Sequence, residues 1–128
     1  MRVLLDTHTL LWWLDGDRRL SRRARALIGD EANEVLVSAV SAWEIAIKAR
    51  LGKLPGALDV AADVAGCLAS QGFDSLEITV RHAQRAGGLA WAHGDPFDRM
   101  LVAQTQLEDL PIVSRDQVFD ECAVTRLW

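Results

Sequence analysis

Short apolar runs that end at polar residues recur along the chain and predict β-strands. The first is Val3-Leu4-Leu5, which ends at the carboxylate of Asp6. Runs of this length are typical of strands that are buried in a sheet. On this pattern we predict strands at residues 3–5, 34–37, 75–78, 111–114 and 122–127.

The segments between these runs carry apolar residues at helical spacing. On this pattern we predict helices at residues 10–14, 21–28, 38–51, 60–71, 80–86 and 95–108, and a turn at residues 52–56. The third helix is capped by Ser38 or Ser41. Its apolar stripe, expected to face the core or a second subunit, comprises Val40, Trp43, Ile47 and Leu51.

The start of the last helix has a strong local signal. Asp95 stands at the N-cap, Pro96 at the first helical position and Asp98 at the third. Strands that alternate with helices in this way predict an α/β layered domain with a mostly parallel sheet. With 128 residues, the chain has the size of one domain, which we place at residues 1–128.

Composition limits the class of protein further. Half of the residues are hydrophobic and a quarter are charged, as in globular domains. No stretch approaches ~18 uninterrupted apolar residues, so the sequence predicts no spanning helix and no membrane partner. The first apolar run meets a carboxylate after three residues, which is too short for the core of a signal peptide. We therefore expect a cytoplasmic protein.

The net charge of −4 argues mildly against a nucleic-acid partner, because phosphate binding usually shows as a basic excess. The sum hides an asymmetry. Residues 1–60 contain nine basic and eight acidic side chains, whereas residues 61–128 contain five and ten. Five arginines fall within residues 18–25, and both a solvated helix face and a track for phosphates fit this run.

Two acidic residues follow predicted strands. Asp6 ends the first strand, and Asp116 lies two residues beyond the strand that ends at Ser114. In parallel α/β sheets, ligands bind beyond the carboxyl ends of the strands, so these acids point to one crevice. Glu44, one turn into its helix, and Asp98, in the first turn of its own, can face the same edge.

Each acid also has a purely structural interpretation. Asp6 and Asp116 can cap the turns that follow them, and Asp98 can favour the positive N-terminus of its helix. Glu44 can complete a capping box or pair with Lys48 one turn along the helix. The residues alone leave these alternatives open, and the functional prediction rests on the set of four.

Four carboxylates within several ångströms would repel one another strongly without a cation. Hard oxygen ligands of this kind suit Mg²⁺ or Mn²⁺. Such ions lower the pKa of bound water and neutralise charge in a phosphoryl transition state, so the set predicts metal-dependent hydrolysis of a phosphodiester. A phospho-receiver signalling domain fits less well, because Asp6 has no acidic neighbour and no Asp ends the strand at residues 75–78.

Four segments resemble the successive motifs of PIN domains, and most of all those of the VapC-type toxins of bacterial type II toxin–antitoxin pairs. They are residues 3–8 (VLLDTH), 38–48 (SAVSAWEIAIK), 93–104 (HGDPFDRMLVAQ) and 114–116 (SRD). The second and third are specific, whereas the first alone is weak. His8 is a departure, because many PIN domains carry Asn there. The resemblance extends over the whole chain.

The resemblance implies a three-layer α/β/α sandwich and an endoribonuclease that uses one or two Mg²⁺ or Mn²⁺ ions. Its products would be a 5′-phosphate and a 3′-hydroxyl. The catalytic and metal-binding residues that it implies are Asp6, Glu44, Asp98 and Asp116, with Glu44 binding directly or through water. It also implies supporting hydroxyls at Thr7 and Ser114. We interpret Asp95 as the helix cap, with a supporting role beside the ligands as the alternative.

The resemblance further implies partners. These are an RNA substrate and a small cognate antitoxin that inhibits the site, within a homodimer and a higher toxin–antitoxin assembly. Trp12 is a candidate anchor for an interface, with a core position as the alternative. A non-catalytic PIN-like interaction module is the competing function. Such modules usually lose one or more of the acids, and all four are present here.

Basic side chains near the acids or in the arginine run are candidates for contact with RNA. They are Arg22, Arg23, Lys48 and Arg99. Trp91, in the loop before the last helix, fits either stacking on a base or packing of the loop. We expect packing or surface roles for His82 and His93, and small buried hydrophobes at Cys67 and Cys122.

Overall fold

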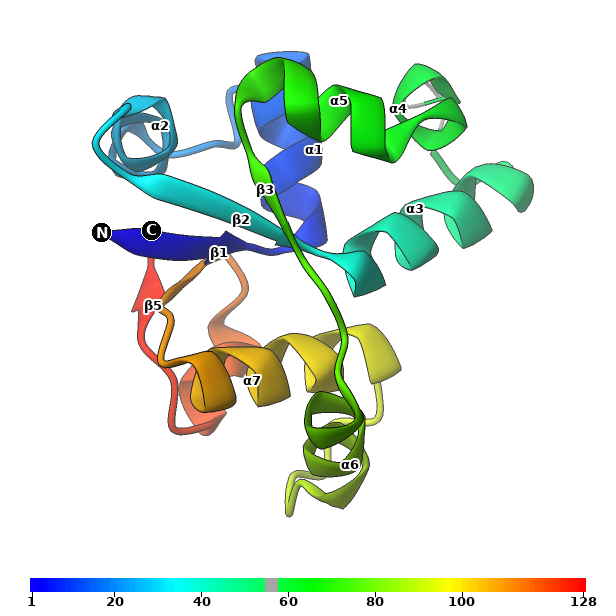
Figure 1. Ribbon diagram of the computed structural model, residues 1–128, viewed down its shortest axis with the longest axis vertical. Helices are drawn as coiled ribbons and strands as arrows, with labels where there is room; N and C mark the ends of the chain where they lie inside the picture. Colours follow the sequence, from blue (N-terminus) through cyan, green and yellow to red (C-terminus); the bar gives the residue numbers. More distant parts are fainter. Residues whose placement is uncertain (55–57) are drawn as a thin grey trace.

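Five parallel strands form the centre of the protein (Figure 1). The computed structural model describes residues 1–54 and 58–128, and within them the sheet order is β3-β2-β1-β4-β5. The strands are β1 (Arg2–Leu5), β2 (Glu34–Ser38), β3 (Asp74–Leu76), β4 (Ile112–Val113) and β5 (Arg126–Leu127). The predicted α/β class is confirmed, and the sheet is parallel throughout. Residues 55 and 56 of the predicted turn lie outside the described residues.

Helices connect the strands in chain order. They are α1 (Thr7–Asp15), α2 (Arg22–Gly29), α3 (Ala39–Arg50), α4 (Leu58–Ala62), α5 (Val64–Gln71), α6 (Val80–Gly88), α7 (Pro96–Glu108) and the 3₁₀ helix η1 (Gln117–Glu121). The prediction of a single helix at residues 60–71 is wrong. Asp63 interrupts it, because its side chain accepts a hydrogen bond from the Gly66 N–H and caps α5. Gly72 ends α5 at φ 71°, a backbone conformation that suits glycine.

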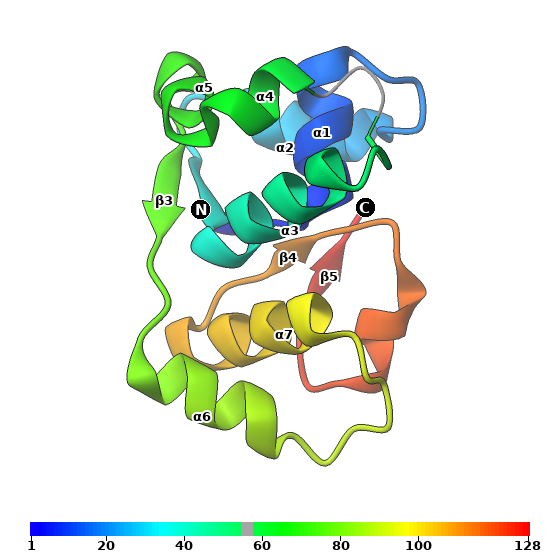
Figure 2. The same ribbon diagram turned by 90° about the vertical axis from the view of Figure 1, so that its right-hand side faces the viewer.

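Side chains of each strand alternate between the two faces of the sheet. Val3 and Val35 pack with α1, α2 and α5 on one face, and Leu4, Leu36 and Ile112 pack with α7 on the other. Figure 2 shows these two helical layers on either side of the strands, with α6 outside α7. Burial of both faces explains why β1, β2 and β4 contain continuous apolar runs. The three-layer arrangement is therefore as predicted.

Helix α3 joins the two layers, because Val40 packs on the α7 side and Ile45 on the α1 side. Its buried residues are Val40, Ser41, Glu44 and Ile45. The core alternative for the predicted stripe is wrong, since Trp43 and Leu51 are 56% and 52% exposed, and the second-subunit alternative stays a prediction. Polar side chains on the buried face explain the error. Of the two predicted caps the structure uses Ser38, whose Oγ accepts from the Val40 N–H at 3.0 Å.

Several smaller predictions concern packing. His82 packs as expected: it is buried, and its Nε2 lies 2.8 Å from Glu108 Oε1 on α7. Cys67 and Cys122 are free and partly buried, so they are more exposed than predicted. Trp12 is partly buried against the α1 side of the core. Among the described residues, no helix has the length and apolar character needed to cross a membrane.

Candidate active site

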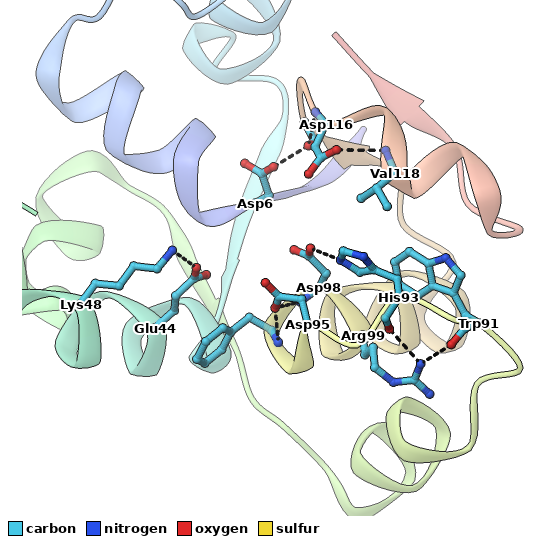
Figure 3. A network of polar contacts seen from close by, with 12 residues as sticks. Asp6, Glu44, Lys48, Trp91, His93, Asp95, Asp98, Arg99, Asp116 and Val118 are labelled. Atoms are coloured by element: carbon cyan, nitrogen blue, oxygen red, sulfur yellow. Dashed lines mark hydrogen bonds and ion pairs between the residues drawn. The ribbon is translucent and has the colours of Figure 1, made fainter. Parts of the chain in front are cut away.

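The carboxyl ends of β1, β2 and β4 lie at one edge of the sheet, and the four predicted acids gather there (Figure 3). Asp6 follows β1, Glu44 lies in α3 after β2, Asp98 lies in the first turn of α7, and Asp116 follows β4. All four line one cavity of about 120 Å³. Its other lining residues are Thr7, His8, Lys48, Asp95 and Leu101.

Asp6 is held by hydrogen bonds at both carboxylate oxygens. Oδ1 accepts from the Thr9 N–H at 2.8 Å and caps α1, and Oδ2 accepts from the Ser114 hydroxyl. Helix α1 therefore begins at Thr7, earlier than the predicted start at residue 10. Only 7% of Asp6 is exposed, and this burial raises the pKa of its carboxyl although both hydrogen-bond donors act to lower it.

Glu44 connects α1 and α3. The Thr7 hydroxyl donates to Glu44 Oε1 at 2.6 Å, and Lys48 Nζ lies 2.5 Å from Oε2. The Thr7 hydroxyl also lies 2.9 Å from Ser41 Oγ. Glu44 is buried and Lys48 is partly exposed, so the carboxylate faces the cavity with its charge balanced by one ammonium group.

Asp98 has a strongly shifted acidity. Burial raises the pKa of Asp98 to about 6, and the charges of Asp95 and Asp116 add to the rise. The hydrogen bond with His93 opposes it, with His93 Nε2 2.7 Å from Asp98 Oδ2. Asp95 is the cap of α7, as interpreted from the sequence, because its Oδ1 accepts from the N–H groups of Phe97 and Asp98.

His93 is a site residue that sequence reasoning missed. With Asp95 and Asp98 it brings three potential ligand atoms within 4.8 Å of one another, the one such group among the residues described. Trp91 packs in the loop with its ring centroid 4.6 Å from that of His93. The signal that could have found His93 is its place two residues before a helix cap, because such residues lie beside the first turn.

Asp116 is joined to Asp6 through a serine. The Asp116 N–H donates to Ser114 Oγ at 3.0 Å, and the same hydroxyl donates to Asp6. Asp116 Oδ1 accepts from the Val118 N–H at 3.0 Å and caps η1. Ser114 is fully buried, whereas Asp116 is exposed at the rim of the cavity. Ser114 therefore fixes the position of one acid relative to the other.

The structural interpretations of these acids are also present. Asp6 and Asp116 cap the helices that follow them, and Glu44 pairs with Lys48. A capping hydrogen bond occupies one lone pair of a carboxylate, and the two oxygens together offer about four, so capping is compatible with binding a cation. The observation that goes beyond structural roles is that the four side chains, from separate elements, line one cavity.

The charge of the cavity fits a divalent cation. Five of its lining side chains are carboxylic acids and Lys48 is the one lysine or arginine among them. The raised pKa values of Asp6 and Asp98 show that the anionic forms are under-stabilised by the protein alone. Carboxylate oxygens suit Mg²⁺ or Mn²⁺, and Mg²⁺ keeps several waters, so not every acid has to touch the ion.

Arg99 uses its guanidinium group inside the fold. It donates to five backbone carbonyls at 2.7–3.4 Å. They belong to Ala86, Gly87, Leu89, Trp91 and His93. Arg99 therefore clamps the loop between α6 and α7 that carries His93 (Figure 3). Because its donors are engaged in this way, we do not keep Arg99 among the proposed RNA contacts.

The other candidate RNA contacts differ in position. Lys48 lines the cavity beside Glu44. Arg22 and Arg23 are exposed on α2 and do not line it. Figure 1 shows α2 near the starts of β1 and β2, whereas the acids follow the strand ends.

The fold and site define an α/β protein with a carboxylate-lined cavity at the strand ends of a parallel sheet. The family model for the PIN domain matches residues 3–124. The chain therefore belongs to the PIN domain family. Over 66 residues it is 42% identical to Ribonuclease VapC16 of Mycobacterium tuberculosis (strain ATCC 25618 / H37Rv). This match covers 50% of the chain and 47% of the relative, so it spans about half the length of that protein.

Solved structures share the fold over most of the chain. The structure of VapBC2 from Rickettsia felis bound to a DNA fragment from their promoter gives a TM-score of 0.69 at 12% identity, covering 99% of this chain and 98% of that chain. FitAcB from Neisseria gonorrhoeae gives 0.65 at 17% identity, covering 100% and 97%. A toxin–antitoxin complex from Klebsiella pneumoniae gives 0.64 at 20% identity, covering 90% and 87%.

Proposed function

We propose that this chain is a cytoplasmic, metal-dependent endoribonuclease that acts as the toxin of a type II toxin–antitoxin pair. The observation that carries the proposal is the single cavity lined by four acids from separate elements. Membership of the PIN domain family and the partial match to a protein named as a ribonuclease support the reaction class.

The four acids would hold the ion in two ways. Asp6, Asp98 and Asp116 would bind one or two Mg²⁺ or Mn²⁺ ions, and Glu44 would bind directly or through water. A bound ion of this kind lowers the pKa of water and neutralises charge on the phosphoryl group in the transition state. Thr7 and Ser114 orient the carboxylates of Glu44 and Asp6, because each donates its hydroxyl to that acid.

Other side chains position the site or its substrate. His93 fixes the Asp98 carboxylate at 2.7 Å, and Arg99 fixes the loop on which His93 lies. Lys48 neutralises Glu44 and, as the lysine of the cavity, is proposed to contact a phosphate of the substrate. The roles of His93 and Arg99 depend on the folded loop. These two residues therefore position the site, whereas the four acids would hold the ion.

Cleavage of RNA by substituted proteins tests the proposal. Asp6→Asn and Asp98→Asn should abolish cleavage in Mg²⁺ or Mn²⁺, and EDTA should abolish cleavage by the wild type. Asparagine also caps helices well, so Asp6→Asn should keep α1 intact. Asp74→Asn, at an exposed position in β3, is the matched control and should cleave normally. Cleavage by Asp6→Asn at the wild-type rate would contradict the assignment.

The partner part of the proposal has separate support. One structural neighbour is described as a toxin–antitoxin complex. We propose a small antitoxin that inhibits the site, and a toxin homodimer. Co-expression with the product of a neighbouring short reading frame should give a complex, whose mass is measured by light scattering after gel filtration. This complex should not cleave RNA. Failure to find such a protein would contradict the toxin assignment and leave the nuclease assignment standing.

A further inference from the structure

A second, larger hollow opens beside the acidic cavity. It has a volume of about 880 Å³ and shares Asp6, His8 and Asp116 with the cavity. The remaining lining residues are Trp12, Arg19, Arg115, Gln117, Arg126 and Trp128. We call this hollow the arginine–tryptophan groove. Because it shares three lining residues with the cavity, a ligand that lies in the groove can extend to the acids.

The three arginines of the groove differ in whether a carboxylate pairs with them. Arg19 pairs with Asp17 at 2.7 Å and Arg126 pairs with Asp120 at 2.9 Å. Arg115 is exposed and has no hydrogen-bond or ion-pair partner among the residues at 1–54 and 58–128. Residues 61–128 contain only five basic side chains, and two of them line this groove. Arg115 is therefore the arginine of the groove whose charge is available to a ligand.

Aromatic rings form the other component of the groove. The rings of Trp12 and Trp128 lie 6.0 Å apart at 62°, and His8 lies 5.9 Å from Trp12. Arg19 Cζ lies 5.0 Å from the centre of the Trp12 ring. Trp12 is thus already covered by an arginine, whereas Trp128, which is partly exposed, has no such cation over its ring among the described residues. Trp128 is the ring that can accept a stacked base.

We propose that the arginine–tryptophan groove binds single-stranded RNA next to the cleaved bond, with Arg115 contacting a backbone phosphate and Trp128 stacking on a base. The inference rests on the proposed function, because it places the substrate strand of the same site. Grooves that bind single strands combine cations along the backbone with aromatic rings under the bases. A duplex offers its phosphates but keeps its bases stacked and paired, so the tryptophan favours a single strand.

Binding can be measured without cleavage in the full-length Asp98→Asn protein. The probes are a fluorescein-labelled 12-nucleotide oligouridine and a labelled 12-base-pair RNA duplex, titrated in EDTA and followed by fluorescence anisotropy over a series of NaCl concentrations. On this background, Arg115→Ala should weaken binding of the single strand and lower the slope of log K against log salt by about 0.7, the value for one phosphate contact. Trp128→Leu, which keeps an apolar side chain for packing, should weaken binding about five-fold or more.

Matched controls separate the groove from general effects of charge and surface. Arg81→Ala removes an exposed arginine on α6, and Trp43→Leu removes an exposed tryptophan on α3. Neither residue lines the groove or the cavity, so both variants should bind the single strand as their parent does. Thermal unfolding of each protein checks that Trp128→Leu and Arg115→Ala remain folded.

The outcomes distinguish this inference from the nuclease proposal. If Arg115→Ala and Trp128→Leu bind the single strand like their parent while the wild type cleaves RNA, the groove assignment is wrong and the nuclease stands. If the groove variants lose binding but the wild type cleaves no RNA, the groove stands and the nuclease fails. Equal or tighter binding of the duplex overturns the single-strand assignment. If Arg115→Ala and Trp128→Leu keep RNA binding but lose the antitoxin complex in the gel-filtration experiment, the groove belongs to a protein partner instead.

Discussion

Acidic side chains in two regions of this protein respond in opposite ways to their surroundings. In the cavity, burial raises the pKa of Asp98 to about 6. At the surface, hydrogen bonds from Arg19 lower the pKa of Asp17 to about 2, and Arg126 lowers that of Asp120. The residue type is the same in each case. The difference arises from burial and from whether a guanidinium group faces the carboxylate.

This contrast shows where the fold leaves negative charge without a balancing partner. Asp17 and Asp120 each pair with an arginine and remain in contact with water. In the cavity, Lys48 pairs with Glu44 and His93 bonds to Asp98. Asp6 and Asp116 form no ion pair with a lysine or arginine among the described residues. Unbalanced charge that is partly buried opposes folding, and such groups are typical of functional sites. A cation that binds in the cavity would supply the missing charge.

The largest expected effect comes from exchanging one acid of each region for its amide. Asp98→Asn should lower cleavage of RNA by more than about 100-fold, beyond the range seen for groups that only support metal ligands. Asp17→Asn should leave cleavage within about two-fold, because Asp17 lies outside the cavity. Initial rates on a labelled RNA in Mg²⁺ measure both. Equal losses in the two variants would show that the contrast between the regions has no functional meaning.

The next effect is on stability, and its sign differs between the regions. The folded pKa of Asp98 is about 6 against a usual 3.8, so the folded state binds this proton more tightly than the unfolded state. The stability that this group contributes is fully present below pH 3.8 and is lost as the pH rises through about 6, by at most about 3 kcal/mol. For Asp17 the contribution is present above pH 3.8 and is lost as the pH falls towards 2.

Urea unfolding of the metal-free protein between pH 4.5 and 7.5 measures this effect. Asp98→Asn should become more stable than the wild type as the pH rises, because the amide cannot acquire the unfavourable charge. Mg²⁺ should stabilise the wild type more at pH 7.5 than at pH 5, since it binds the ionised acids of the folded state. A stability difference that does not change with pH would contradict the raised pKa as the cause.

Local sequence signals predicted the elements that the chain specifies locally. The Asp95 cap with Pro96 placed the start of α7 correctly, because a cap and the first helical turn are adjacent in sequence. The apolar runs at β1 and β2 were correct because parallel strands are buried on both faces. The same reasoning correctly predicted that Asp6 and Asp116 lie at one edge, since parallel strands have their carboxyl ends at the same edge of the sheet.

Errors occurred where distant contacts determine the environment of a residue. Trp43 was expected on a stripe that faces the core or a second subunit, but α3 turns Glu44 inward to meet Thr7 of α1 and so keeps the tryptophan out of the core. The contact between His93 and Asp98 depends on the path of a loop. That path is held by Arg99, whose five carbonyl partners cannot be inferred from spacing.

The arginines of the two regions also differ. Arg19 and Arg126 bind surface carboxylates, whereas Arg99 binds backbone carbonyls of the loop that carries His93. Arg99→Lys keeps the charge but replaces a planar group of five donors by a compact ammonium group. We expect the variant to lose about 1–2 kcal/mol of stability, with cleavage reduced about ten-fold as the loop carrying His93 loosens. Chemical denaturation and initial rates measure the two effects, and Arg81→Lys, exposed on α6, is the matched control. Unchanged cleavage in Arg99→Lys would show that the clamp does not position the site.

The smallest effect on cleavage and RNA binding is expected from the arginines of α2, which have no place in the site. Arg22 and Arg23 are exposed on α2 and line neither the cavity nor the arginine–tryptophan groove. Because substitutions at such surface positions change energies by about 0.5 kcal/mol or less, Arg22→Ala with Arg23→Ala should keep cleavage within about two-fold. The salt slope of RNA binding should change by less than about 0.7, the value for one phosphate contact on a single strand. Arg115→Ala, measured in the same salt series, provides the contrast. A larger change in the α2 variant than in Arg115→Ala would place the main phosphate contacts on the arginine run and not beside the acids.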